Sequence, residues 1–509
     1  MDADVAVIGF GPVGTVAAGL LGKQGLRVLV IEKDEKVFPL PRAAHVDHTG
    51  LRTIQELGCL DALLPKMIRN KRLDLVDANR RMLARIPADQ ESVSGLPTSV
   101  YFYQPEFDAA LRRTASAFPN VDVRLNTEMT GLVAKADEVL IRFRTHSGKN
   151  ESARVGWVLG CDGAWSLVRD LMNIKLESMN FDEQWLVLDL RIETPQSSLP
   201  TDHVVEVCDP ARPYLSTPIS ADRQRFEFML LPGENPEHMK RPHMIRKLLE
   251  SWIPADSYQI ERVAVYTFHG LVAERWRDGR IFIAGDAAHQ TPPFLGQGMC
   301  AGIRDAANLA WKLAHVVKGG APCDLLDTYE LERRPHAIKV INAAIRIGKV
   351  ICELDPRKAA ERNVLLRANN SQMRKELSFA LPRLEPGPLV LRGGGSLFVQ
   401  PVIGGRRFDD IIGSRFLVLA RSAAALGKTV DWWADELGAR VAQLQEFDDA
   451  ALNQWFARYK AEVAVVRPDR YVLGTANSLD QITDAVQAQL AGDKCRGSIG
   501  RRVSRMSAI

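Results

Sequence analysis

The stretch from Val5 to Glu32 constrains this chain more than any other, because it reads as a strand, a glycine turn, a helix and a second strand. Glycines at positions 9, 11 and 14 follow the apolar run that ends at Ile8, in GxGxxG spacing. In such units the glycines allow a tight turn, close approach of a pyrophosphate and close helix packing, while the terminal acid binds a ribose diol. An incidental glycine-rich turn is the alternative, but all the parts stand in register. We therefore expect a dinucleotide site containing Gly9, Gly11, Pro12, Val13, Gly14, Glu32 and the adjacent Lys33.

Length and charge bound the overall organisation. The 509 residues exceed what one core holds, and 46% hydrophobic with 25% charged residues is typical of a globular protein. We expect two or three domains. The net charge of +4 is small, and its most visible cluster is the tail at 493–509, which we expect to be disordered. The sequence has no basic face interleaved with aromatic residues, so we do not expect nucleic-acid binding.

The seven cysteines are scattered and form no CxxC motif. This spacing favours a reducing compartment and argues against a structural metal site or a disulfide framework. The first apolar run lacks the basic start of a signal peptide, and no other window is apolar enough to span a bilayer. We therefore predict a cytoplasmic protein with no membrane partner.

The loop beyond the second strand carries polar residues suited to a cofactor. Arg42 is placed to pair with a phosphate, although it could equally be a surface arginine. His45 and His48 flank Asp47; we favour His48 as a proton acceptor, with a structural role as the alternative, and we expect no metal site because no third metal ligand is nearby. Gln104 opens a later helix, where it could reach the linking phosphates or simply cap the helix.

Two further motifs occur where predicted strands end. WVLGCDGAWSLVR, at 157–169, contains Asp162 and Gly163, and the run from 281 to 313 contains Gly285 and Asp286. A carboxylate at a strand end can accept a hydrogen bond from a polyol, and bare amides at a helix start stabilise an anion or a reduced ring. Three such motifs in one chain indicate one extended cofactor. The residues expected at its ring end are Pro293, Gly296, Gln297, Gly298 and Met299.

On these motifs the chain resembles the single-component (class A) flavoprotein aromatic hydroxylases, and most closely the bacterial 3-(3-hydroxyphenyl)propionate hydroxylase type. The matching segments are IGFGPVG with Glu32, GCDGAWSLVR, AGDAAHQTPPFLGQGMCAGIRDAANLAWKL and TYELERRP. Additional matches are VVEVCDPARPY, FEFMLLPGE and RPDRYVLGTA. The resemblance covers essentially the whole chain.

The resemblance implies an α/β fold with three parts. A glutathione-reductase-type FAD-binding Rossmann domain would comprise residues 1–75, 100–178 and 270–385. An antiparallel-sheet substrate domain, inserted as 76–99 and 179–269, would form a roof over the flavin. A thioredoxin-like C-terminal domain would comprise 389–492; because it lacks CxxC, we expect packing or homodimerisation as its role.

The resemblance also assigns roles to individual residues. It implies that Glu32 binds the adenosine ribose, that Arg42 and Gln104 lie at the pyrophosphate, and that Asp286 binds the ribitol. Asp162 would serve both FAD and the nicotinamide donor, and the 293–299 stretch would border the isoalloxazine. Cys300 stands where many relatives carry asparagine. Since only one complete dinucleotide fingerprint is present, NADH or NADPH would visit transiently.

The implied activity is FAD-dependent hydroxylation of a phenolic compound with NAD(P)H and dioxygen, through a flavin C4a-hydroperoxide. Such chemistry needs a dry pocket and a way to remove the phenol proton. We take His48 and Pro293 as catalytic candidates. Core packing is the alternative for the residues expected to face the substrate, and Arg225 could instead pair with Glu227 or Asp222. These candidates are Tyr103, Trp185, Tyr214, Thr217 and Arg225, an arginine being suited to an acidic substrate side chain.

Two other classes of function fit the same fold. A reductase or a halogenase is one, but the halogenase motif WxWxIP is missing and only Trp252-Ile253-Pro254 resembles its end. A non-catalytic flavin-binding or ligand-binding protein is the other. The intact Asp162, Asp286 and glycine-rich helix entry argue against it, although they indicate binding rather than turnover.

Overall fold

The computed structural model describes residues 1–377 and 379–491, and its first large sheet is built around β1. The two strands next to β1 run parallel to it and are apolar along the part that pairs with it, as expected for a sheet covered on both faces. β9 (Glu128–Ala134) and β10 (Val139–Arg144) extend the sheet in antiparallel fashion from β11. The main order is β17 (Arg277–Asp278), β18 (Ile281–Ile283), β11 (Asn150–Gly160), β1 (Ala3–Ile8), β2 (Val28–Ile31) and β8 (Val121–Arg124).

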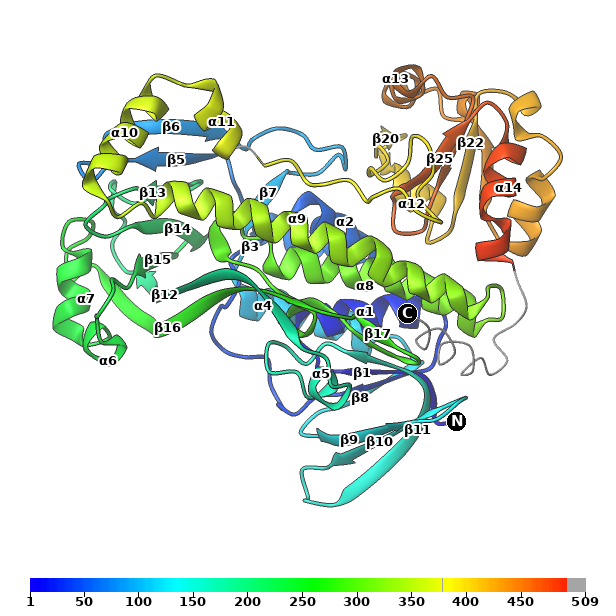
Figure 1. Cartoon of the computed structure of the whole chain (residues 1–509), viewed down its shortest axis with the longest axis horizontal. Helices are drawn as coiled ribbons and strands as arrows, with labels where there is room; N and C mark the ends of the chain where they lie inside the picture. Colours follow the sequence, from blue (N-terminus) through cyan, green and yellow to red (C-terminus); the bar gives the residue numbers. More distant parts are fainter. Residues whose placement is uncertain (378, 492–509) are drawn as a thin grey trace, which may run out of the picture.

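Helices pack on this sheet and on one another. α1 contacts both α4 and α8, and α8 runs beside the long helix α9 through the middle of the molecule (Figure 1). α2 ends at Gly58, which adopts φ +91°, a left-handed conformation that glycine takes without strain. The helices are α1 (Pro12–Lys23), α2 (His48–Leu57), α3 (Leu60–Leu63), α4 (Gln104–Ser116), α5 (Leu167–Leu171), α8 (Gly298–Val317), α9 (Asp327–Ile351), α10 (Pro356–Arg367) and α11 (Ser371–Leu377).

A second large sheet, here called the roof sheet, lies beside the first (Figure 1). It is antiparallel except where β5 runs parallel to β13. The boundary expected between residues 75 and 76 is wrong, because it cuts β5, and the whole strand pairs within the roof sheet. α6 (Pro236–Met239) and α7 (Pro242–Leu249) pack on one face. The strand order is β19 (His289–Gln290), β16 (Tyr258–Ala273), β12 (Leu176–Ile192), β15 (Arg223–Met229), β14 (Tyr214–Ser220), β13 (Val204–Val207), β5 (Arg72–Val76) and β6 (Met82–Pro87).

A small sheet links the two large ones. It has the order β3 (His45–Asp47), β7 (Ser99–Tyr101) and β4 (Ile68–Arg69), and both β4 and β7 contact β14 of the roof sheet. The histidine loop that follows the dinucleotide unit is thereby carried to the roof.

The C-terminal part has its own sheet, in the order β23 (Arg440–Gln443), β22 (Leu417–Ala420), β24 (Val463–Val466) and β25 (Val472–Ala476). β22 is parallel to β23 and antiparallel to β24. The last described helix is α14 (Leu479–Leu490), capped by the Ser478 side chain. The other elements are β20 (Val402–Ile403), β21 (Arg406–Arg407), α12 (Phe408–Ile412) and α13 (Ala450–Tyr459).

The predicted tail at 493–509 lies outside the described residues. Within the described part, no helix is both long and apolar enough to cross a membrane. Five cysteines within the described residues are free, at positions 59, 161, 208, 300 and 352.

Candidate functional site

The glycine turn has the geometry of a phosphate cradle. Gly9 has φ +94°, and a Cβ on it would lie 2.5 Å from the Cys161 carbonyl oxygen; a Cβ on Gly14 would lie 2.1 Å from the Gly9 oxygen. Gly11 differs, because nothing lies within 4 Å of the position of its missing Cβ. No side chain caps α1, so its first amides stay available for an anion. The residues therefore fit a pyrophosphate over Gly11.

Glu32 and Gln104 shape the rim of this cradle. The buried Glu32 carboxylate accepts hydrogen bonds from the amides of Phe10, at 2.6 Å, and Asp34, at 2.9 Å, while Lys33 is exposed beside it. The Gln104 Oε1 accepts from the amides of both Arg42 and Ala43 at 2.6 Å. Gln104 thus fixes the loop that presents Arg42, whose guanidinium lies over the Phe38 ring.

The second motif is held in shape by Asp162. Its carboxylate accepts from the Ser166 hydroxyl at 2.5 Å and from the Val168 amide at 3.0 Å. Burial raises its pKa, although these hydrogen bonds act the other way. The adjacent Gly163 has φ +81°. Arg169 donates to the carbonyls of Ala164 and Ala287, so the second motif is joined to the third.

The third motif packs directly on the first. A Cβ on Gly302 would lie 2.5 Å from Val13 Cγ2, and one on Gly285, where φ is +61°, would lie 3.0 Å from the same atom. Asp286 is exposed to solvent, yet enough protein surrounds it to raise its pKa above the usual carboxyl range. That combination is expected of a side chain in a recess. The three motifs therefore meet at one place, as the sequence predicts.

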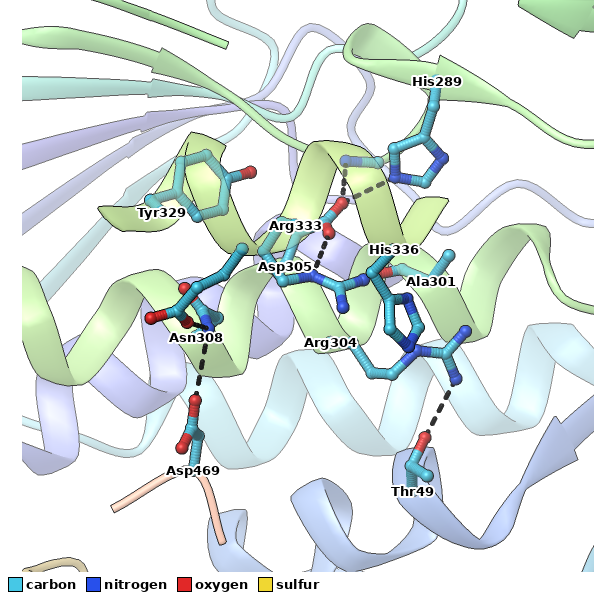
Figure 2. Close-up of polar contacts among 12 residues, drawn as sticks. Thr49, His289, Ala301, Arg304, Asp305, Asn308, Tyr329, Arg333, His336 and Asp469 are labelled. Atoms are coloured by element: carbon cyan, nitrogen blue, oxygen red, sulfur yellow. Dashed lines mark hydrogen bonds and ion pairs between the residues drawn. The ribbon is translucent and has the colours of Figure 1, made fainter. Parts of the chain in front are cut away.

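A buried polar network holds the third motif (Figure 2). Asp305 on α8 accepts from the Gly285 amide at 3.1 Å, from Arg333 Nε at 2.9 Å, and lies 2.7 Å from His289 Nε2. Although burial opposes ionisation, His289 and Arg333 keep the pKa of Asp305 below its usual value. Sequence reasoning missed these three residues; charged residues on otherwise apolar helices were the available signal.

Arg304 on α8 forms a second group of buried polar contacts, which fixes the start of that helix. It donates to Asp47 Oδ2 and to Gln297 Oε1, both at 2.8 Å, and to the Thr49 hydroxyl, toward which it points in Figure 2. The Gln297 side chain is thereby turned inward and buried. No side chain caps α8, so the amides of its first turn remain bare. Nothing lies within 4 Å of a Cβ position on Gly298.

The loop at 293–299 packs against His45. Pro293–Leu295 form a short 3-10 turn and Gly296 has φ +60°, where a Cβ would lie 2.6 Å from His45 Nδ1. That nitrogen is 3.1 Å from the Gly296 carbonyl oxygen, and Nε2 is 2.6 Å from Ser99 Oγ. Met299 is partly buried against the core, and the Cys300 thiol accepts from the Asp47 amide. His48 instead meets Ser94 Oγ at 3.0 Å.

Two expected substrate residues share the roof face that looks toward this loop. The Trp185 ring meets the Phe294 ring edge-on, with centroids 5.8 Å apart, and Thr217 is buried where β14 contacts β7. Tyr103 is the residue just before α4, and the Arg223 guanidinium lies 4.4 Å from the centroid of its ring.

The other two expected substrate residues have protein partners. Arg225 is buried and donates to Asp189 at 2.7 Å, so its charge is balanced; Glu227 is a weaker partner at 3.7 Å. Tyr214 lies on the opposite face, against the expectation that it lines one pocket with Thr217. Its hydroxyl accepts from Trp252 Nε1 and its ring stacks on Phe228.

Comparisons with known proteins agree with this geometry. Residues 2–344 match a family described as FAD binding domain, and residues 395–489 match the HcaD C-terminal domain. The chain is 34% identical to the 3-(3-hydroxy-phenyl)propionate/3-hydroxycinnamic acid hydroxylases of Escherichia coli and Shigella sonnei, over 93% of this chain and 91% of theirs.

Solved structures show the same fold. Aklavinone-11 hydroxylase, in a ternary complex with FAD and aklavinone, superposes with a TM-score of 0.79 at 22% identity, covering 96% of this chain and 99% of the other. p-Nitrophenol 4-monooxygenase from Pseudomonas putida DLL-E4 superposes with a TM-score of 0.67 at 25% identity, covering 73% and 95%. With a family match over most of its length, this chain belongs to the FAD-binding family of class A flavoprotein aromatic hydroxylases.

Proposed function

We propose that this protein hydroxylates a phenolic compound at FAD, using NADH or NADPH and dioxygen. The observation that carries the proposal is the convergence of three strand-end motifs, locked by Gly302 against Val13 and by Arg169 against Ala287. The relatives named as hydroxylases align with 93% of this chain, which supports the same reaction class.

The cofactor is FAD; when bound, it would pass two electrons from the nicotinamide donor to dioxygen, one atom of which would go to the substrate and the other to water. The α1 amides above Gly11 would bind the pyrophosphate, with Arg42 and Gln104 nearby and Glu32 on the ribose. Asp286 would accept from the ribitol, and Asp162 would serve both FAD and the donor. The bare amides of the first turn of α8, which begins at Gly298, would stabilise negative charge on the ring.

We propose that the roof sheet binds the substrate and excludes water. Its contact with the flavin loop through Trp185 and Phe294 supports this role. Pro293 would contribute by fixing the backbone of that loop. The domain division proposed here follows the expected one, with the roof piece beginning at residue 72 to include all of β5.

Removal of the phenol proton needs a neutral base. Burial lowers the pKa of both His45 and His48, which keeps them neutral at pH 7. His48 remains our predicted acceptor, and His45 is a second candidate because it touches Gly296. A pH profile of the first-order rate of product formation in each His→Gln variant separates the two.

The C-terminal part is proposed to be thioredoxin-like. The order β23, β22, β24, β25, with one parallel and two antiparallel pairs, supports that assignment. Its role would be packing or homodimerisation, which sedimentation of the purified protein tests.

The experiment follows NADH and NADPH oxidation by the FAD-loaded protein across a panel of phenols, with dioxygen uptake and hydrogen peroxide measured together. We expect at least one phenol to accelerate oxidation while little peroxide appears. If every phenol leaves the rate unchanged, or all dioxygen returns as peroxide, the proposal fails.

A further inference from the structure

The roof face toward the flavin loop carries two glutamates. Glu206 on β13 and Glu227 on β15 both stand opposite Leu215 of β14, so they point to the same face. Glu227 also stands opposite Val187, two residues along β12 from Trp185. Because side chains alternate along a strand, both carboxyl groups share the face on which Trp185 meets Phe294.

Polar atoms on this face lack hydrogen-bond partners. Glu206 is 4% exposed and Glu227 is 7% exposed, and one carboxyl oxygen of each is buried without any partner. The Tyr101 hydroxyl is also buried, beside the Thr217 side chain, and the charge of Glu206 acts on it. Since buried polar groups in proteins are nearly always hydrogen-bonded, the two carboxyl oxygens without a partner on one face indicate a ligand that donates hydrogen bonds.

The local charges are unevenly matched. Arg225 lies 2.7 Å from Asp189 and Arg262 lies 3.3 Å from it, whereas Glu227 has only the 3.7 Å contact to Arg225. No salt bridge to Glu206 is found within the part of the chain that the structure describes. Burial, reinforced by Glu227, raises the pKa of Glu206 to about 8. The place therefore disfavours negative charge, and an additional carboxylate would be buried there without a free cation among the described residues, which is costly.

We propose that Glu206, assisted by Glu227, binds a hydrogen-bond-donating substituent of the phenolic substrate, a hydroxyl or an ammonium, and selects against a carboxylate. This inference rests on the proposed function, because it assigns the substrate class of that site. It replaces the expectation of an acidic substrate side chain held by Arg225, whose charge Asp189 already balances. It also separates this chain from relatives named for propionate and cinnamic acid substrates.

The test uses three ligands with one ring and one chain length: 3-(3-hydroxyphenyl)propionate, 3-(3-hydroxyphenyl)propan-1-ol and 3-(3-hydroxyphenyl)propylamine. Their dissociation constants are measured from the flavin absorbance change of the FAD-loaded protein, without turnover. We expect the better of the alcohol and the amine to bind at least about tenfold tighter than the propionate, about 1.4 kcal/mol. Which of the two binds tighter identifies the donor as hydroxyl or ammonium.

Glu206→Leu should bring the three dissociation constants to within about threefold of one another, because it removes the acceptor. Glu206→Gln preserves size and keeps the fold testable; it should retain the alcohol and weaken the amine. The matched control is Glu193→Gln, an exposed carboxyl just beyond β12 that accepts from Gln259, and it should leave the ranking unchanged. FAD content of each variant checks folding.

Tighter binding of the propionate by the unaltered protein would overturn the inference. So would an unchanged ranking in both Glu206 variants, or failure of all three ligands to bind. These results are distinguishable from failure of the proposed function. If some phenol is hydroxylated but the three ligands bind equally well, only the inference is wrong. If the alcohol or the amine binds tighter than the propionate but no phenol is hydroxylated, only the proposed hydroxylase reaction is wrong.

Discussion

Gly11 is the residue at which the phosphate cradle can be tested with the least effect on folding. It has φ −70° and open space where a Cβ would stand, so Gly11→Ala should leave the melting temperature of the apoprotein almost unchanged. A methyl group there would meet the pyrophosphate, and we expect FAD affinity to fall by at least about tenfold. Fluorescence titration with FAD measures this.

Gly131→Ala is the matched control for this test, since its Cβ position is equally open and it lies on β9. Equal FAD affinity of Gly11→Ala and Gly131→Ala would contradict the proposal that the pyrophosphate of FAD lies over Gly11.

Asp286 is the second residue at which cofactor binding can be tested. Because the side chain is exposed, Asp286→Ala should fold normally but lose the acceptor for the ribitol. We expect weaker FAD binding or slower reduction by NAD(P)H, measured by flavin content and stopped-flow absorbance. Normal cofactor content together with a normal reduction rate would remove Asp286 from the site.

At the scale of elements, Asp305 should connect α8, α9 and the third motif. Asp305→Ala leaves Arg333 and His289 buried without their carboxylate, and we expect the free energy of unfolding to fall by about 3–5 kcal/mol. Glu128→Ala, which removes an exposed ion pair with Arg144, should cost about 0–1 kcal/mol. Urea denaturation compares the two, and equal losses would mean that the network does not hold the elements together.

What could be predicted depended on how local the pattern is. The unit from β1 to β2 follows from residues close in sequence, and the structure confirms its strand, turn and helix. Strand alternation alone would have placed Tyr214 and Thr217 on opposite faces, since they are three residues apart. The Arg225–Asp189 and His289–Asp305–Arg333 contacts join separate elements, so no short pattern in one sequence reveals them.

At the scale of the whole molecule, the C-terminal part is fastened to the FAD-binding part by buried charges. Arg467 donates to Glu332 on α9 at 2.8 Å, and Arg52 on α2 donates to Asp409 on α12 at 2.6 Å. The segment Arg467-Pro468-Asp469-Arg470 therefore contributes Arg467 to this contact. Figure 2 shows Asp469 of the same segment reaching Asn308 on α8.

The contact between Glu332 and Arg467 should weaken at low pH. Burial opposes ionisation of Glu332, but Arg467 and Lys312 lower its pKa from 4.5 to about 2. A carboxyl group whose pKa is lower in the folded state stabilises the protein fully above its unfolded pKa and loses that contribution as pH falls toward the folded value. We expect urea stability to fall between about pH 4.5 and pH 2, and Glu332→Gln to flatten part of that fall. An identical pH dependence in the variant would contradict the assignment.

The measurement that tests the central claim most directly is the origin of the oxygen atom in the product. The FAD-loaded protein is supplied with NAD(P)H, the phenol that best stimulates oxidation, and dioxygen labelled with oxygen-18, and the product is analysed by mass spectrometry. A monooxygenase places one labelled atom on the ring of each product molecule. A product without label, or no hydroxylated product at all, would contradict the account.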